Sequence, residues 1–178
     1  MDNAVRKFWF EEIEPKQWWV TDTTFDASIR ERFLPLLNRA AQAELFLWRE
    51  KPTDRLAEII VLDQFSRNIH RNTPAAFAHD PMALVLAQEA VTAGALSHLS
   101  PVERAFLLLP YIHSESREIH AIAEGLYGEQ APQGNYEFEL KHKVIIDRFG
   151  RYPHRNAILG RLSSEEEIEF LKHPGSGF

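Results

Sequence analysis

TDRLAEIIVLDQFSRNIHR, residues 53–71, carries the most informative hydrophobic pattern for the fold. Its centre is apolar on most sides, so the pattern predicts a buried helix rather than a helix on the surface. Steps of three and four residues along one face lead from Leu56 to Asp63 and Arg67. The same face is therefore apolar at its N-terminal end and charged at its C-terminal end, so it places ionisable groups towards the interior.

Helical periodicity continues on both sides of this stretch. Further helices are expected over Val5–Ile13, from Thr24 or Asp26 to about Glu44 with a kink at Pro35, from Asp80 to about Ala93, over Tyr136–Phe149, and after a cap at Ser163 or Ser164. Residues 105–127, AFLLLPYIHSESREIHAIAEGLY, are expected as one kinked helix or two abutting ones, with a break near Pro110 and a stop around Gly125–Gly128. Other boundary signals are a capping box at Ser100 and left-handed stops at Gly94 and Gly150.

No stretch alternates apolar and polar residues over enough positions to predict a strand. The fold class is therefore all-α. The 178 residues fit a single domain, 1–178, which is long enough to bury a core. Helices joined by short loops predict antiparallel helical hairpins, about eight helices packed as a bundle or as a short solenoid.

Composition narrows the class of protein. A formal charge of −6 and a pI near 5.8 argue against binding to nucleic acid or to an anionic membrane. The absence of cysteine excludes disulfides, thiolate catalysis and cysteine-ligated metals. With no secretory leader and no apolar segment of membrane-spanning length, a cytoplasmic protein is expected. The core is expected to take up all four tryptophans, Trp9, Trp18, Trp19 and Trp48.

Three helices carry ionisable side chains on faces that should be buried. These side chains are Asp63, Arg67, His70 and Arg71 in the first helix, His113, Arg117 and His120 in the second, and His142 in the third. A buried charge is costly unless it is paired and hydrogen-bonded. The groups must therefore satisfy one another or face a pocket that contains water. An ion pair between Asp63 and Arg67, four residues apart, is the purely structural interpretation.

The segment RFGRYPHRNAILGR, residues 148–161, concentrates positive charge. It contains Arg148, Arg151, Arg155 and Arg161. Gly150 and Pro153 interrupt the helix, so these arginines can point inward from several directions. A guanidinium suits phosphate or carboxylate, which it binds through two parallel hydrogen bonds. The alternative is that the arginines cap helix carbonyls and pair with acidic helices.

Established chemical signatures are missing. The sequence contains no phosphate-binding loop, HExxH pair, nucleophile elbow or dinucleotide fingerprint. The histidines and Glu115 match no metal-ligand spacing, so no metal and no other cofactor is expected. Ser114 adjoins His113 and Glu115, but neighbours on a helix point in different directions, which argues against a serine nucleophile.

Several motifs occur in a fixed order along the chain. They are LDQFSRNIHR (62–71), PAAFAHD (74–80), LLLPYIHSES (107–116), RFGRYPHRNAILGR (148–161), SSEEEIEFL (163–171) and the terminal Phe178. Together they resemble the bacterial family catalogued as domain of unknown function 924, over nearly the whole chain. The resemblance implies an all-helical fold similar to tetratricopeptide-like helical hairpins. It implies no established activity.

The leading functional hypothesis is an internal pocket for a small anionic molecule, with acid–base hydrolysis or transfer that forms no covalent intermediate. The expected ligand-binding residues are Arg67, Arg71, Arg148, Arg151, Arg155 and Asn156. The expected proton carriers are His113, His142 and His154, with Asp63, Glu115 or Asp147 to orient them. The alternative is a tetratricopeptide-like module that binds a protein partner in a groove, with the polar cluster purely structural.

Overall fold

The computed structural model describes residues 3–177, and every regular element in that range is helical. The longer α-helices are α2 (Thr23–Ala41), α3 (Pro52–Ile60), α5 (Asp80–Thr92), α6 (Pro101–His113), α7 (Arg117–Gln130) and α8 (Gln133–Phe149), and the shorter ones are α1 (Ala4–Lys7), α4 (Ser66–Ile69), α9 (Asn156–Leu159) and α10 (Glu165–Leu171). The all-helical class is confirmed, consistent with a bundle or a solenoid. The tetratricopeptide-like arrangement stays a prediction, and Phe178 lies outside the described residues.

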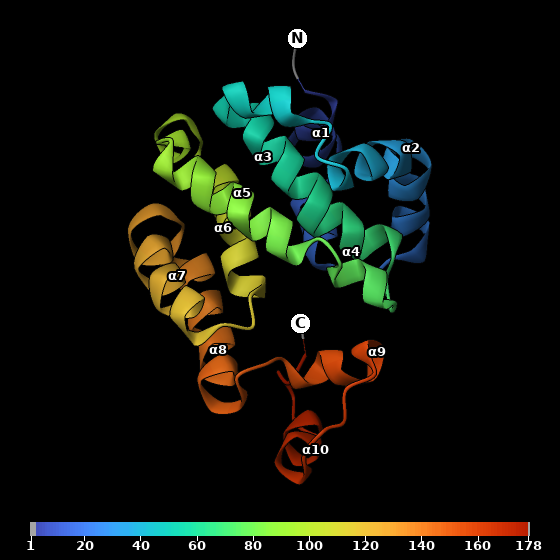
Figure 1. Cartoon of the computed structure of the whole chain (residues 1–178), viewed down its shortest axis with the longest axis vertical. Helices are drawn as coiled ribbons and strands as arrows, with labels where there is room; N and C mark the ends of the chain where they lie inside the picture. Colours follow the sequence, from blue (N-terminus) through green and yellow to red (C-terminus); the bar gives the residue numbers. More distant parts are fainter. Residues whose placement is uncertain (1–2, 178) are drawn as a thin grey trace.

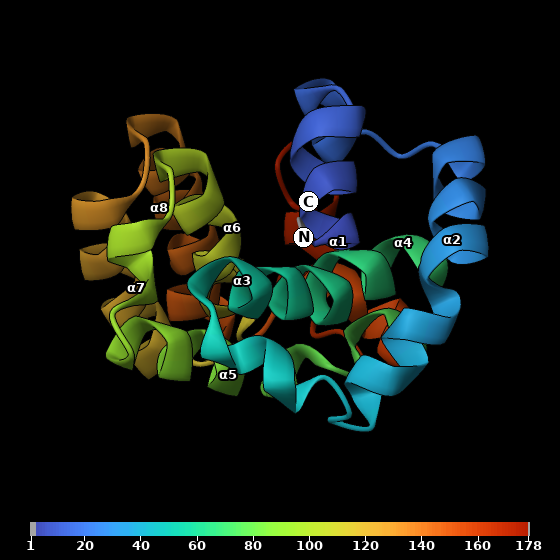
Figure 2. The same ribbon diagram turned by 90° about the horizontal axis from the view of Figure 1, so that it is seen from above.

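One continuous helix runs through the middle of the molecule (Figures 1 and 2). It consists of α3, a π-helical turn at Val61–Phe65 and α4. Helices α5 and α6 pack against its first half, and α2 packs against its second half. The side chains of Leu56, Ile60 and Phe65 are at most 1% exposed, which confirms the predicted burial of this stretch.

Helices α6, α7 and α8 pack in sequence on one side of that central helix (Figure 2). A fully buried polar pair joins α7 to α8, because His120 Nδ1 lies 2.8 Å from Glu139 Oε1 and neither side chain is exposed. The other ring nitrogen of His120 donates to the carbonyl of Ser114 over 2.9 Å. The prediction that α7 presents a polar group from its core side is therefore confirmed at His120.

The predicted break near Pro110 is wrong. Helix α6 passes through Pro110 and ends at His113, because proline removes only one ladder hydrogen bond and the residues around it, Leu109 and Tyr111, are buried in the core. The break lies at residues 114–116, where the Ser116 hydroxyl accepts a hydrogen bond from the amide of Ile119 and starts α7. The predicted stop around Gly125–Gly128 is also wrong, since α7 continues to its end at residue 130.

Helix starts agree with the sequence in part. Ser100 and Ser164 cap their helices as predicted, each in a capping box. Helix α2 is capped by Asp22, two residues before Thr24 and four before Asp26, because Asp22 accepts hydrogen bonds from the first amides. Asp80 was expected to cap α5, but its carboxylate bonds to Arg67 instead.

The tryptophans do not all lie in the core. Trp9 is 1% exposed and packs edge-on against the rings of Phe65 and Phe106. Trp18 and Trp48 are half-buried. Trp19 is 55% exposed, so the expectation of a core position is wrong for that residue. Its ring stacks on Phe106 at the surface, where aromatic packing does not need full burial.

The residues after α8 form an arm that returns towards the centre of the molecule. Gly150 ends α8 with a φ of 70°, a left-handed stop as predicted. Figure 1 shows α9 and α10 at the end of the molecule opposite α1. Arg161 fastens the arm to the loop after α6 through two bonds of 2.6 and 2.8 Å to the carboxylate of Glu115. This attachment brings residues 152–158 against α6.

Candidate functional site

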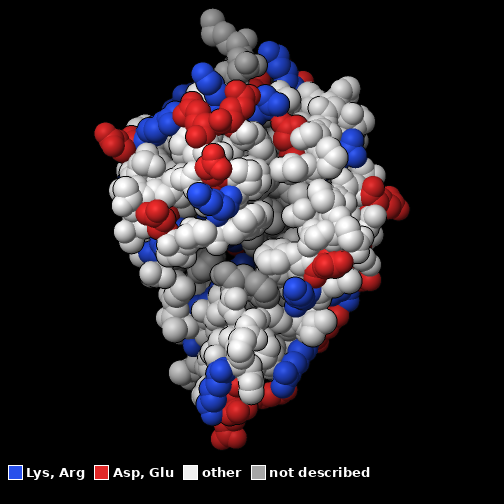
Figure 3. Space-filling view, turned by 180° about the vertical axis from the view of Figure 1, so that it is seen from behind, with Lys and Arg blue, Asp and Glu red and all other residues white. Residues whose placement is uncertain are grey.

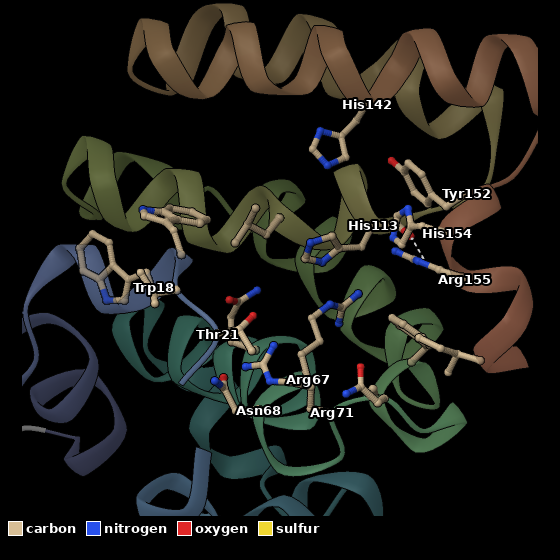
Figure 4. Close-up of a pocket in the computed structure, with 18 of the residues that line it drawn as sticks. Trp18, Thr21, Arg67, Asn68, Arg71, His113, His142, Tyr152, His154 and Arg155 are labelled. Carbon is tan, nitrogen blue, oxygen red and sulfur yellow. Dashed lines mark hydrogen bonds between the residues drawn. The ribbon is translucent and has the colours of Figure 1, made fainter. Parts of the chain in front are cut away.

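A cavity of about 280 Å³ lies between the central helix, α6, α8 and the segment 152–158. Its described lining includes three arginines and three histidines but no Asp or Glu: Arg67, Arg71, Arg155, His113, His142 and His154. In Figure 4, His113 lies near the middle, with the arginines of the central helix on one side and His142 on the other. The cavity thus gathers donor groups from four separate parts of the chain.

His113 and Asp63 form a buried dyad beside this cavity. The Nδ1–H of His113 donates to Asp63 Oδ1 over 2.7 Å. The Asp63 side chain is 1% exposed and also accepts from Gln64 Nε2 over 2.6 Å. His113 Nε2 meets no hydrogen-bond partner within residues 3–177. A carboxylate that holds Nδ1–H leaves the Nε2 lone pair available, which is the form of imidazole that accepts a proton.

The position of Asp63 follows from the shape of the central helix. Asp63 lies in the π-helical turn Val61–Phe65, where the helix is locally wider. Such turns are rare and occur often at functional sites, because the extra residue changes the direction of the side chains that follow. Here the turn places Asp63 opposite the last residue of α6, His113.

The charge state of the dyad is set by burial and by Arg67. Burial alone would raise the pKa of Asp63, but the positive charge of Arg67 and the hydrogen bond from His113 hold that pKa below its usual range. Burial and the repulsion from Arg67 lower the pKa of His113, more than Asp63 raises it. At neutral pH the dyad is therefore a carboxylate and a neutral imidazole, so His113 is poised as a base.

Arg155 is the least satisfied arginine of the cavity. Its side chain is 7% exposed, and its Nη1 donates to the carbonyl of His113 over 3.1 Å and approaches Asp80 Oδ2 at 3.4 Å. Its buried Nε has no acceptor within residues 3–177. The guanidinium lies 4.7 Å from the ring centroids of both Phe77 and Tyr152. A buried cation with unused donors between two rings is well suited to an anionic ligand.

Arg67 and Arg71 also line the cavity, but each already holds a carboxylate. Arg67 binds both oxygens of Asp80 at 2.9 Å and also bonds to Asp63 at 3.1 Å. The predicted Asp63–Arg67 ion pair is thus present. Arg71 binds both oxygens of Asp26 at 2.5 and 2.8 Å. These two arginines supply positive potential, while their strongest hydrogen bonds are made within the protein.

His142 and His154 bring further imidazoles to the cavity (Figure 4). His142 Nδ1–H donates to the carbonyl of Phe138 over 2.8 Å, and burial lowers its pKa to about 3. Burial and the neighbouring Arg155 lower the pKa of His154 to about 4. Both side chains are therefore neutral at physiological pH.

The structure does not bring every predicted residue to this cavity. Arg148 bonds to Glu166 at the surface, and Arg151 binds both oxygens of Glu167. Asn156 is buried and bonds to Ser163, Glu167 and Arg161. Asp147 pairs with Lys143 in an exposed position, and Glu115 holds Arg161 and the amide of Tyr152. These side chains bond to one another or to neighbouring parts of the fold and do not line this cavity.

Sequence reasoning missed the aromatic part of the lining. Trp18, Trp19 and Phe138 lie along one side of the cavity, and Phe77 and Tyr152 flank Arg155. The adjacent tryptophans were the available signal, because two large rings next to one another in a turn cannot both be buried in a small core. Nothing in the local pattern marked Phe77, since its contact with Arg155 joins parts of the chain far apart in sequence.

Other classes of site receive no support in the described range. Within residues 3–177, no three His, Asp or Glu side chains come together in a way that would hold a metal ion. No helix of that range is both long and apolar enough to cross a membrane. On the face in Figure 3, basic and acidic side chains are interspersed and are densest towards its two ends, so this face has no broad basic surface.

Comparisons with other proteins identify the family to which the chain belongs. A family model described as a bacterial protein of unknown function, DUF924, matches residues 5–175. Among solved structures, the protein of unknown function ATU0120 from Agrobacterium tumefaciens is similar, with 34% identity and a TM-score of 0.90 over 94% of each chain. The search of curated proteins found no match. The chain therefore belongs to the bacterial DUF924 family, whose function is unknown.

Proposed function

We propose that the cavity binds a small organic anion and that the Asp63–His113 dyad performs acid–base chemistry on it. The observation that carries the proposal is the pairing of two features in one cavity. A buried carboxylate holds the neutral imidazole of His113 through Nδ1 and leaves Nε2 available, and Arg155 presents a buried Nε–H without an acceptor in residues 3–177. The first is the arrangement of a general base, and the second is an anion anchor.

The aromatic side of the cavity indicates what the rest of the ligand is like. Trp18, Trp19 and Phe138 offer ring surface, while Gln64 and Asn68 offer amide groups. Small-molecule sites generally combine an apolar lining with a few polar groups that fix orientation. A carboxylate or phosphate monoester attached to a flat or apolar body fits this lining.

Hydrolysis is the reaction that these groups support best. His113 Nε2 would accept a proton from a water molecule as the water oxygen attacks an acyl or phosphoryl centre. The imidazolium would then return that proton to the leaving group, and Asp63 would stabilise it meanwhile. No covalent intermediate is required. The described lining contains two hydroxyl side chains, Thr21 and Tyr152, and neither bonds to His113.

A thermal-shift screen with benzoate, phenyl phosphate and related carboxylates and phosphate esters tests binding. A ligand at a hundred times its dissociation constant should stabilise the protein by about 2.7 kcal/mol. Arg155→Met should weaken binding at least tenfold, because it removes the anchor while Arg67 still satisfies Asp80. The matched control is Arg39→Met, since Arg39 is 57% exposed and pairs with Glu44.

His113→Gln separates binding from chemistry. Glutamine keeps a polar side chain at residue 113 but cannot act as a base near neutral pH. Ligand binding should survive in this variant, and turnover of a substrate found in the screen should fall about a hundredfold or more. The proposal fails if no anion stabilises the wild type, or if Arg155→Met and Arg39→Met bind equally well.

A further inference from the structure

A second cavity, of about 450 Å³, adjoins the first. The two cavities share three wall residues, Phe77, His113 and Arg155. Phe77 comes from the turn before α5, His113 ends α6, and Arg155 belongs to the arm. His113, the proposed base, and Arg155, the proposed anion anchor, therefore lie between the two cavities.

The lining of the second cavity is more apolar than that of the first. Its remaining walls are mostly aliphatic, with Pro74, Ala78, Pro81, Leu84, Pro110 and Leu159. Its two carboxylates bond most closely to arginines outside the cavity, Asp80 to Arg67 and Glu115 to Arg161, and Asp80 also lies 3.4 Å from Arg155. Arg155 is the cation of this lining. A mainly apolar cavity with one cation in its lining favours a ligand whose apolar group is attached directly to an anionic group.

Arg155 is placed to serve both compartments. It borders each of them, its guanidinium lies 4.7 Å from the ring centroid of Phe77, and its Nε lacks an acceptor within residues 3–177. The aromatic lining formed by Trp18 and Trp19 is restricted to the first cavity. A ligand held at Arg155 thus meets rings and amides in one direction and aliphatic walls in the other.

We infer that the ligand of this site is an amphiphilic anion whose apolar acyl or alkyl chain lies in the second cavity. The inference rests on the proposed function and specifies its substrate class. The anionic group meets Arg155, the chain extends between Leu84 and Leu159, and the polar or flat part faces the first cavity. The bond to be hydrolysed then lies beside His113, between the two compartments.

Calorimetry with butyrate, hexanoate, octanoate and benzoate tests the inference. For the wild type, affinity should rise up to about fourfold for each added methylene until the second cavity is filled. Leu159→Trp, which narrows the second cavity, should remove this gain while benzoate still binds. Ala157→Trp is the matched control, because Ala157 is an exposed residue of α9 that lines neither cavity. It should keep the gain with chain length.

The outcomes separate the inference from the proposed function. If benzoate binds but affinity does not rise with chain length, the second cavity is not a chain site and the inference is wrong, while the anion site stands. The same holds if the gain persists in Leu159→Trp, or if Ala157→Trp alone removes it. If neither benzoate nor any alkanoate binds to the wild type, the proposed function fails together with the inference.

Discussion

Arg155 differs from the other arginines of the segment 148–161 only through its surroundings. Each of the other three, Arg148, Arg151 and Arg161, bonds to a glutamate at 2.9 Å or less. Arg155 instead lies 3.4 Å from Asp80, a carboxylate that already binds Arg67. The sequence predicted a cluster of anion-binding arginines but could not rank its members. Their ranking depends on where Glu115 and the acidic start of α10 fall in space, which one-dimensional periodicity does not determine.

The histidines make the stability of the protein depend on pH. Burial lowers the pKa of His142 to about 3, below the ordinary value of 6.5. Between these two values the unfolded chain binds a proton at this residue and the folded protein does not. The contribution of neutral His142 to the free energy of unfolding is therefore fully present above pH 6.5 and is lost as the pH drops towards 3. This single group should cost the wild type about 2 kcal/mol by pH 5.

His142→Gln checks this expectation, because glutamine cannot take up the proton. Urea unfolding at pH 7, 6 and 5 should show a shallower loss of stability in the variant than in the wild type. His98→Gln, at an exposed position, is the control and should follow the wild type. Identical pH profiles for His142→Gln and the wild type would show that His142 is not held neutral by the fold.

At the scale of elements, the central helix was predicted well and its π-helical turn was not. The apolar centre of residues 53–71 was sufficient to predict a buried helix. The turn at Val61–Phe65 contains Asp63, whose partner His113 of α6 is 50 residues away in the chain, so local periodicity gives no sign of it. The break between α6 and α7 was misplaced for a similar reason. Carbonyls freed at the end of α6 are satisfied by Arg155 and His120, and local sequence does not encode those contacts.

The pair of His120 and Glu139 should account for much of the packing of α7 on α8. Removing one member leaves a buried polar group without its partner, so Glu139→Leu should destabilise the protein by about 3 kcal/mol. The double variant His120→Phe with Glu139→Leu should cost less than the sum of the two single changes. Free energies of unfolding in urea provide the double-mutant cycle. Additive costs would mean that the two side chains do not depend on each other.

At the scale of the whole molecule, the candidate site exists because the arm returns to the helical body. Arg67 and His113 come from the body, and His154 and Arg155 come from the segment after Gly150. The sequence indicated that this segment turns inward, from its glycine and proline. It did not reveal that Glu115 would bind Arg161 and so anchor the arm. The proposed site thus depends on a contact between distant parts of the chain.

Hydrogen exchange read by mass spectrometry, with and without benzoate, tests the shared site most directly. Benzoate should slow amide exchange in two separate segments of the wild type, residues 64–77 and 152–158, because both wall the first cavity. Helix α10, away from the cavity, should be unchanged, and Arg155→Met should lose both effects together. Protection confined to one segment, absent from both, or retained in Arg155→Met would contradict an anion site formed jointly by the central helix and the arm.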